Sequence, residues 1–173
     1  MTMRIMFVFA VFLLCCQAAF CADLYSGGFA QDVSDSLFPF LAVGEASLLL
    51  DGHKGRDAAT QGLKALVVTD LATAVLRAAV REKRPNRESY NSFPSRHAAA
   101  AFCMAAVISG YDSDWRIPAY GAASLIGWSR VETRNHYWHD VIGGAALGYF
   151  VARAFTKDNS AFSSRTVGCS FSW

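Results

Sequence analysis

Five apolar segments, rich in alanine, dominate the chain between residues 37 and 155. They cover residues 37–50, 58–80, 98–111, 116–128 and 141–155, and short polar stretches separate them. Alanine has the highest helix propensity, and the segments lack the strict apolar–polar alternation that marks a half-buried strand. The sequence therefore predicts an all-α fold, a helical bundle of five to six apolar helices.

The regions outside these segments suggest how the chain is divided. A basic start through Arg4, an apolar run and small residues up to Ala22 form the layout of a secretory signal peptide. We expect residues 1–21 to be a signal peptide or a first transmembrane anchor, and residues 22–36 to be a linker. Residues 37–156 form the expected helical domain, and residues 157–173 form a C-terminal tail.

Composition excludes some classes of function. The formal net charge of +2 gives no support for nucleic-acid binding. The five cysteines include no CxxC pair and no cysteine–histidine pattern typical of zinc sites, so no disulfide framework is predicted. Hydrophobic residues make up 53% of the chain and charged residues 17%, and the mean hydropathy is +0.23. These values favour a protein that works in or near a membrane.

The first of three polar clusters contains Arg77 and, seven residues later, Arg84 followed by Pro85. Proline ends helical register, so this cluster should lie where an apolar helix stops. The planar guanidinium group binds two phosphate oxygens at once, and several converging on one anion make a strong receptor. A solvated basic loop, or a patch that touches anionic lipid headgroups, is the alternative.

The second polar cluster is Pro94-Ser95-Arg96-His97, which directly precedes four alanines. We expect a helix to begin here, with Ser95 as its N-cap. The free backbone N–H groups and the positive end of the helix dipole favour a bound phosphate or oxyanion. His97 would then lie in the first turn, beside that anion. The alternative is an ordinary serine cap with an unrelated histidine.

The third polar cluster joins Ser129-Arg130 to His136 and Asp140, which lie four residues apart. On a helix this spacing puts both on one face, where the carboxylate accepts a hydrogen bond from the imidazole. That bond fixes the tautomer and leaves the other nitrogen as nucleophile or base. A metal site of His136, His139 and Asp140 is the alternative, but the neighbouring arginines would repel a cation.

We expect the bundle to be membrane-embedded, with a secreted soluble helical domain as the alternative. A span requires about 20 apolar residues, and several segments are shorter. Glu45, Lys64 and Asp70 would be costly facing lipid, and Asp70 is expected to be a buried hydrogen-bonding group. However, alternating the segments across a bilayer from Arg4 inside puts Lys54, Arg56 and Arg153 inside, as the positive-inside rule expects. The same alternation puts the polar clusters outside, where their basic residues break the rule unless they have another role. His53 is expected in a turn, as a loop residue without a role.

In order and spacing, Arg77-x6-Arg84-Pro85, Pro94-Ser95-Arg96-His97 and Ser129-Arg130-x5-His136-x3-Asp140 resemble the three-part signature of the type 2 phosphatidic acid phosphatase superfamily. This superfamily includes membrane lipid phosphate phosphatases, secreted bacterial class A acid phosphatases and vanadium haloperoxidases. The resemblance extends over about residues 58–155. Arg77 stands where the family usually has lysine, and Arg96 where it usually has glycine. If that glycine's N–H binds phosphate, Arg96 can replace it only where φ and ψ permit.

The resemblance implies a metal-independent phosphatase with no cofactor. His136 would attack phosphorus and form a phosphohistidine, Asp140 would orient it, and His97 would protonate the leaving group and then activate water. The groups implied to hold the phosphate oxygens are Arg77, Arg84, Ser95, Arg96 through its backbone, and Arg130.

We therefore expect an enzyme that hydrolyses phosphomonoester or pyrophosphate groups of lipids, with the membrane and a phosphorylated lipid as partners. Its expected location is the bacterial inner membrane, with the active site facing the periplasm. One alternative is a soluble, periplasmic or secreted, non-specific acid phosphatase. Another is a noncatalytic membrane scaffold whose arginines bind anionic lipid. A vanadate-dependent haloperoxidase is a third, which Arg77 and the short chain disfavour.

Overall fold

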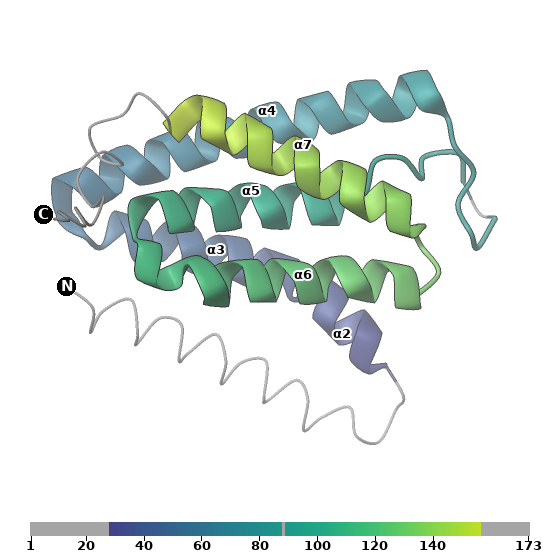
Figure 1. The fold of residues 1–173 in the computed structure, drawn as a ribbon, viewed down its shortest axis with the longest axis horizontal. Coiled ribbons are helices and arrows are strands. Elements are labelled where there is room, and N and C mark those ends of the chain that lie inside the picture. The colour runs from purple at the N-terminus through teal and green to yellow at the C-terminus, as the bar shows by residue number, and fades with distance from the viewer. Residues whose placement is uncertain (1–27, 88, 157–173) are drawn as a thin grey trace, which may run out of the picture.

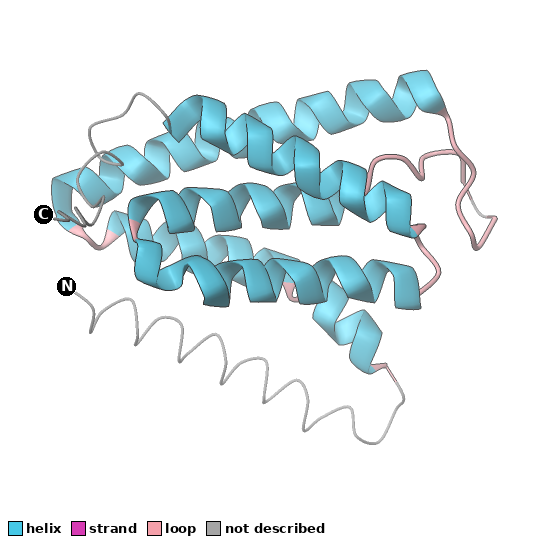
Figure 2. Ribbon diagram, viewed as in Figure 1, coloured by secondary structure: helices cyan, strands magenta, loops and turns pink. Residues whose placement is uncertain are grey.

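The computed structural model describes residues 28–87 and 89–156, which form a bundle of helices (Figure 1). None of these residues lies in a strand (Figure 2). The predicted all-α fold is therefore confirmed, whereas residues 1–21 and 157–173, the expected signal peptide or anchor and the tail, lie outside the described part. The helices are α2 (Phe29–Asp35), α3 (Leu37–Leu49), α4 (Gly52–Val80), α5 (Arg96–Tyr111), the short 3-10 helix η1 (Ser113–Trp115), α6 (Arg116–Glu132) and α7 (Trp138–Thr156).

The five predicted segments correspond to α3 through α7, although several helix ends lie a few residues from the predicted ones. Helix α4 begins at Gly52, so His53 lies in its first helical turn and not in an irregular turn as expected. Phe29–Asp35, expected within a linker, forms α2. This short helix packs against α6, where the rings of Phe29 and Trp128 lie 6.2 Å apart. Tertiary packing therefore orders a segment whose own sequence gives little helical signal.

Helix α5 is the centre of the bundle, and it contacts α3, α4, α6 and α7. Its alanines explain this position, because side chains of one methyl group let four neighbours approach on all sides. The larger side chains that fill the space around it include Phe40 of α3, Met104 of α5 and Ile126 of α6, each at most 1% exposed. Figure 1 shows α5 enclosed by the other helices.

Helices α5 and α7 approach most closely at two glycines one turn apart on α7. A Cβ atom added at Gly144 would overlap the carbonyl oxygen of Ser95, and one added at Gly148 would overlap that of Ala99. Glycine spacing of this kind allows two helix backbones to come into direct contact. As a result the first turns of α5 and α7 are held together, and the Ser95 N–H donates to the Asp140 carbonyl at 2.9 Å.

The outer surface of the bundle carries large apolar side chains. Leu63, Val67, Leu71 and Val75 lie on successive turns of α4 and are 59%, 53%, 61% and 68% exposed. Ile142 and Phe150 of α7 are also more than half exposed. Between residues 28 and 156, however, none of the described helices combines the length and the apolar character needed to cross a bilayer.

Candidate active site

The three polar clusters lie at one end of the bundle. Helices α4 and α6 end there, and α5 and α7 begin there, at the right of Figure 1. Arg77 occupies the last turn of α4 and Arg130 the last turn of α6, as predicted. The loop of residues 81–95 and the short connection of residues 133–137 complete this end. The topology thus brings together residues that are up to 63 positions apart, from Arg77 to Asp140.

His136 is buried at this end, with 1% of its surface exposed. It lies in the connection before α7, so the expectation that His136 and Asp140 share one face of a helix is wrong. The backbone N–H groups of Asn135 and His136 both donate to the Arg130 carbonyl, at 3.1 and 3.0 Å. The carbonyl left free at the end of α6 therefore fixes the backbone of His136.

The carboxylate of Asp140 is completely buried and faces His136. Its Oδ2 lies 3.5 Å from Nδ1 of His136, and neither ring nitrogen of that histidine has a hydrogen-bond partner. Oδ2 also accepts the Ser92 hydroxyl at 2.5 Å and the Tyr137 N–H at 2.8 Å. The Tyr137 contact is the reciprocal half of a capping box, in which the third helical residue caps the residue before the helix. Asp140 is thus held by helix capping and by Ser92 while it faces the imidazole.

The arginines around this pair have partners for only part of their guanidinium groups. Nε of Arg77 donates to the Pro94 carbonyl at 3.0 Å, and Nη1 of Arg84 donates to Asn135 Oδ1 at 3.4 Å. Arg130 is 7% exposed and donates from Nη1 to the Ser34 hydroxyl. The Nε atoms of Arg84 and Arg130 are buried without a partner. A buried cationic N–H is costly unless paired, so these groups suit an anionic ligand.

Electrostatic coupling connects the arginines to both histidines. Burial lowers the pKa of His136 to about 3, helped by Arg84, Arg130 and Arg77, while the Ser92 backbone opposes the shift. Burial also lowers the pKa of His97 to about 4, with Arg130 and Arg77 as the next causes. Both imidazoles are therefore neutral near pH 7. Arg77 and Arg130 lower the pKa of both rings, so the two histidines share the same neighbouring cations.

The second cluster starts a helix as predicted. Ser95 is the N-cap of α5, with extended backbone angles of φ −69° and ψ 115°, and its hydroxyl accepts the Ala98 N–H at a long 3.5 Å. Ser95 is fully buried, and His97 follows in the first turn. The free N–H groups of this turn point toward the same end of the bundle as the arginines.

Arg96 directs its side chain to Asp70 of α4. The pair is bidentate: Nε donates to Oδ1, and Nη2 donates to Oδ2 at 2.9 Å. The side chain of Asp70 is 47% exposed, so the expectation of a buried residue is wrong. Arg96 is the first residue of α5 and does not have a positive φ. Among the described non-glycine residues, positive φ occurs at Arg81, Arg87 and Arg134. Arginine at this position therefore needs no glycine-like conformation.

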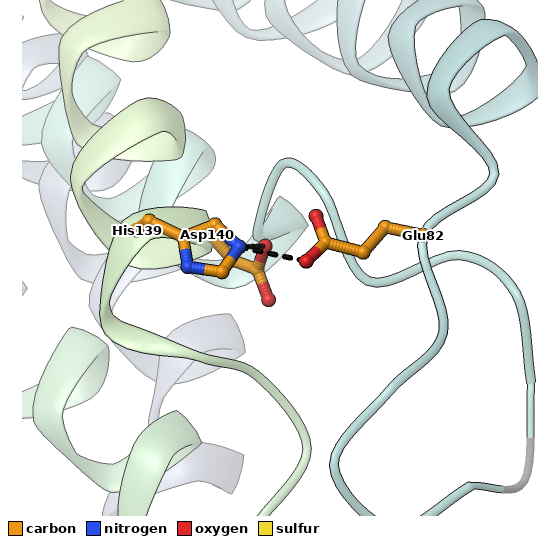
Figure 3. A group of neighbouring side chains, drawn as sticks. All are labelled: Glu82, His139 and Asp140. Carbon is orange, nitrogen blue, oxygen red and sulfur yellow. Dashed lines mark hydrogen bonds and ion pairs between the residues drawn. The ribbon is translucent and has the colours of Figure 1, made fainter.

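Several residues at the site carried no signal in the sequence. Ser34, Ser92 and Asn135 contact Arg130, Asp140 and Arg84. A further group consists of Glu82, His139 and Asp140 (Figure 3). Nε2 of His139 lies 2.8 Å from Glu82 Oε1 and 3.2 Å from Asp140 Oδ1. The metal site considered from the sequence consisted of His136, His139 and Asp140. In the structure, Glu82 and not His136 lies with His139 and Asp140.

Comparison with known proteins identifies relatives. The family model of the PAP2 superfamily matches residues 58–163. A lipid A 1-phosphatase from Porphyromonas gingivalis is 33% identical over 131 residues, which cover 69% of this chain and 28% of that protein. Lipid phosphate phosphatase 1 from Arabidopsis thaliana is 34% identical over 82 residues, covering 38% of this chain and 25% of that protein. The chain therefore spans about a quarter of the length of either relative.

A solved structure shares the fold. It is the crystal structure of the first transmembrane PAP2 type phosphatidylglycerolphosphate phosphatase from Bacillus subtilis. The superposition has a TM-score of 0.61 and covers 89% of this chain and 96% of that one. At 23% sequence identity, the similarity concerns the arrangement of the helices.

Proposed function

Because the chain belongs to the PAP2 superfamily, we propose that it hydrolyses phosphomonoester or pyrophosphate groups of lipids without a metal ion, through a phosphohistidine intermediate. One observation supports this above the others. Burial, and after it Arg77 and Arg130, lowers the pKa of both His136 and His97, so two neutral imidazoles share one group of cations. This combination offers a nucleophile, a proton donor and an anion receptor at a single place.

His136 is the proposed nucleophile. Its low pKa leaves the ring neutral at pH 7, so a lone pair is free to attack. Nδ1 faces Asp140, which would accept its proton in a hydrogen bond, and Nε2 would then form the bond to phosphorus. Ser92 and the Tyr137 N–H keep the carboxylate in place for this role. As the N–P bond forms, the P–O bond to the leaving group breaks.

His97 is the proposed acid and base. A dianionic phosphate bound beside it would raise its pKa from about 4, so that it can carry a proton in the complex. It would give that proton to the departing alkoxide or phosphate. In the second half of the reaction it would take a proton from water, whose oxygen attacks phosphorus while the N–P bond breaks.

The phosphate oxygens would be held by the partly unpaired donors of the site. These are the buried Nε groups of Arg84 and Arg130, the remaining donors of Arg77, the Ser95 hydroxyl and the Arg96 N–H. Donors that are fixed before the reaction stabilise the charge that develops on the transferring phosphoryl group. The arginines would then perform the charge neutralisation that magnesium performs in other phosphatases.

The lipid preference and the membrane location rest on the outer surface and on the relatives. The exposed stripe of Leu63, Val67, Leu71 and Val75 would contact acyl chains, with the polar end of the bundle outside the apolar layer. Both curated relatives are named for lipid phosphates. We propose that the protein lies in the bacterial inner membrane with this end toward the periplasm, where a headgroup could reach the arginines.

The test is a panel of phosphorylated lipids and water-soluble phosphates, assayed with EDTA. We expect phosphate release from lipids, undiminished by EDTA. A preference for soluble esters would instead favour the soluble acid phosphatase, and release by osmotic shock without detergent would support it. A protein that binds anionic lipid without turnover, and binds equally well after alanine replaces His97 and His136, would be the scaffold.

A further inference from the structure

Two carboxylate oxygens converge on one imidazole nitrogen beside the proposed active site. Glu82 Oε1 and Asp140 Oδ1 lie 2.8 and 3.2 Å from Nε2 of His139 (Figure 3). The three candidate ligand atoms all lie within 4.8 Å of one another. Oδ1 of Asp140 is fully buried and has no hydrogen-bond partner, although it points into this group. Nε2 of His139 is its polar neighbour in this group, and a buried carboxylate oxygen that accepts no hydrogen bond favours a positive charge close by.

We propose that Glu82, His139 and Asp140 form a binding site for a divalent cation of the zinc type, and that its occupancy inhibits the enzyme. The site differs from the set of His136, His139 and Asp140 weighed from the sequence, because Glu82 supplies the third ligand and His136 is left out. The proposed binding site consists of these three residues alone. The inhibition rests on the proposed function.

The spacing of the ligand atoms suits a small cation. Zinc bonds to nitrogen and oxygen are about 2.0–2.2 Å, so ligand atoms of a tetrahedral site lie roughly 3.3 Å apart. The two distances from Nε2 of His139, 2.8 and 3.2 Å, are close to that spacing, and the two carboxylate oxygens lie within 4.8 Å of each other. Glu82 can adjust to that geometry, because it lies in the loop after α4 and its side chain is 30% exposed. His139 is 58% exposed, which leaves a path to solvent and an open fourth position.

Neighbouring groups already orient the two ligands on α7. The His139 ring stacks on Tyr137, with centroids 5.3 Å apart and planes at 10°, and on Phe93 at 6.3 Å and 26°. Oδ2 of Asp140 is occupied by Ser92 and the Tyr137 N–H, so Oδ1 is the oxygen turned toward His139. Contacts of this kind, one layer beyond the ligands, are what hold metal-binding side chains in place.

The ligand set also selects the metal. Magnesium and calcium prefer oxygen ligands only, whereas an imidazole with two carboxylates suits zinc, cobalt or manganese. Arg77, which interacts electrostatically with Asp140, opposes any cation, so we expect weaker binding than at structural zinc sites. A cation bound to Oδ1 would draw the negative charge of Asp140 away from His136. The imidazolium-like charge that develops during attack would then be less stabilised, and turnover would fall.

The experiment uses the full chain in detergent, freed of metal with EDTA and then dialysed. Cobalt is titrated as a spectroscopic probe, and zinc is titrated by calorimetry. Glu82→Gln and His139→Ala remove one ligand each, and neither residue belongs to the proposed catalytic groups. The Glu82→Gln variant would keep the backbone bond in which the Ser92 N–H donates to the carbonyl of residue 82. His53→Ala is the matched control, because His53 is an exposed histidine at the start of α4.

We expect one equivalent of cobalt with tetrahedral absorption, and a loss of affinity of tenfold or more in both ligand variants but not in His53→Ala. Zinc should inhibit the wild type and spare His139→Ala. Equal affinity in all four proteins would mean an adventitious ion only, and would overturn the site, as would the absence of binding. Binding without inhibition would overturn the regulatory effect alone. Absence of phosphatase activity in every protein would refute the proposed function, while the titrations would still decide the site.

Discussion

The hydroxyl of Ser92 donates to Oδ2 of Asp140 at 2.5 Å and ties the loop after α4 to the first turn of α7. Both groups are fully buried, so the bond joins two segments 48 residues apart where water cannot replace it. The same carboxylate oxygen faces His136. The position of the proposed nucleophile's partner thus depends on a serine outside all three sequence motifs.

Replacing Ser92 with alanine should therefore reduce both stability and turnover. Loss of a hydrogen bond to a buried charged group costs about 1–3 kcal/mol. Thermal unfolding measures the first effect, and phosphate release measures the second. Ser89→Ala is the control, because Ser89 lies in the same loop and its hydroxyl donates to Asn91 instead. Equal behaviour of the two variants would contradict the role of Ser92.

Replacing His136 with alanine should abolish phosphate release and leave the protein folded. Neither ring nitrogen makes a hydrogen bond of normal geometry, so the substitution removes no strong contact of that kind. Circular dichroism checks the fold, and trapping with radiolabelled substrate checks the phosphohistidine. Substantial remaining activity would refute the assignment of the nucleophile.

Replacing Arg130 with lysine should lower kcat/KM by a factor of about 100 or more, which corresponds to roughly 3 kcal/mol. Nη1 of Arg130 donates to Ser34, and its Nε is left for the proposed phosphate. Lysine keeps the charge but has a single nitrogen and cannot replace both donors. Arg116→Lys, at the exposed start of α6, should leave kcat/KM unchanged. If both variants kept full activity, a geometric role for the guanidinium group would be excluded.

Acid should destabilise the protein through His136. Its pKa is lowered to about 3 in the folded state, whereas an unfolded histidine titrates near 6.5. Between these values the unfolded state binds the extra proton, so the free energy of unfolding falls as the pH falls through this window. From pH 7 to pH 5 this one group should cost about 2 kcal/mol. Urea unfolding in detergent at both pH values measures the loss, which should be smaller in His136→Asn; an identical loss would show that His136 is not responsible.

Replacing Gly148 with alanine should separate α5 from α7. The added Cβ would overlap the Ala99 carbonyl oxygen, a backbone atom that cannot rotate away. Gly121→Ala in α6 is the matched control, because its added Cβ meets nothing within 4 Å. In Gly121→Ala, the higher helix propensity of alanine should stabilise the folded protein by up to about 1 kcal/mol. Thermal unfolding of the two variants should therefore shift in opposite directions, and a neutral Gly148→Ala would disprove close backbone packing.

Local patterns in the sequence were enough to predict the helices and the ends at which the motifs lie. Alanine-rich apolar runs identified α3 to α7, and the serine before four alanines identified the start of α5. The i, i+4 spacing of His136 and Asp140 was misleading, because the helix begins between them. A residue just before a helix and a residue in its first turn can be four positions apart, as His136 and Asp140 are, and this is also the spacing of two residues on one helix face.

Contacts between distant segments could not be predicted from one sequence. Ser92 reaches Asp140 across 48 positions, and Glu82 reaches His139 across 57. Arg96 meets Asp70 across 26, and no periodicity along the chain relates such residues. Their positions follow from how closely α5 and α7 pack and from the course of the loop of residues 81–95. Tertiary packing, rather than local propensity, selects these partners.

The attachment of His136 to the Arg130 carbonyl has a mechanical consequence. A tilt of α6 as a rigid body would carry the His136 imidazole, the proposed nucleophile, and the Arg130 guanidinium in the same direction. His97 belongs to α5 and does not share that movement. Thermal motion of α6 would therefore move the proposed nucleophile together with one of the proposed phosphate-binding arginines, and would change their distance from the proposed proton donor on α5.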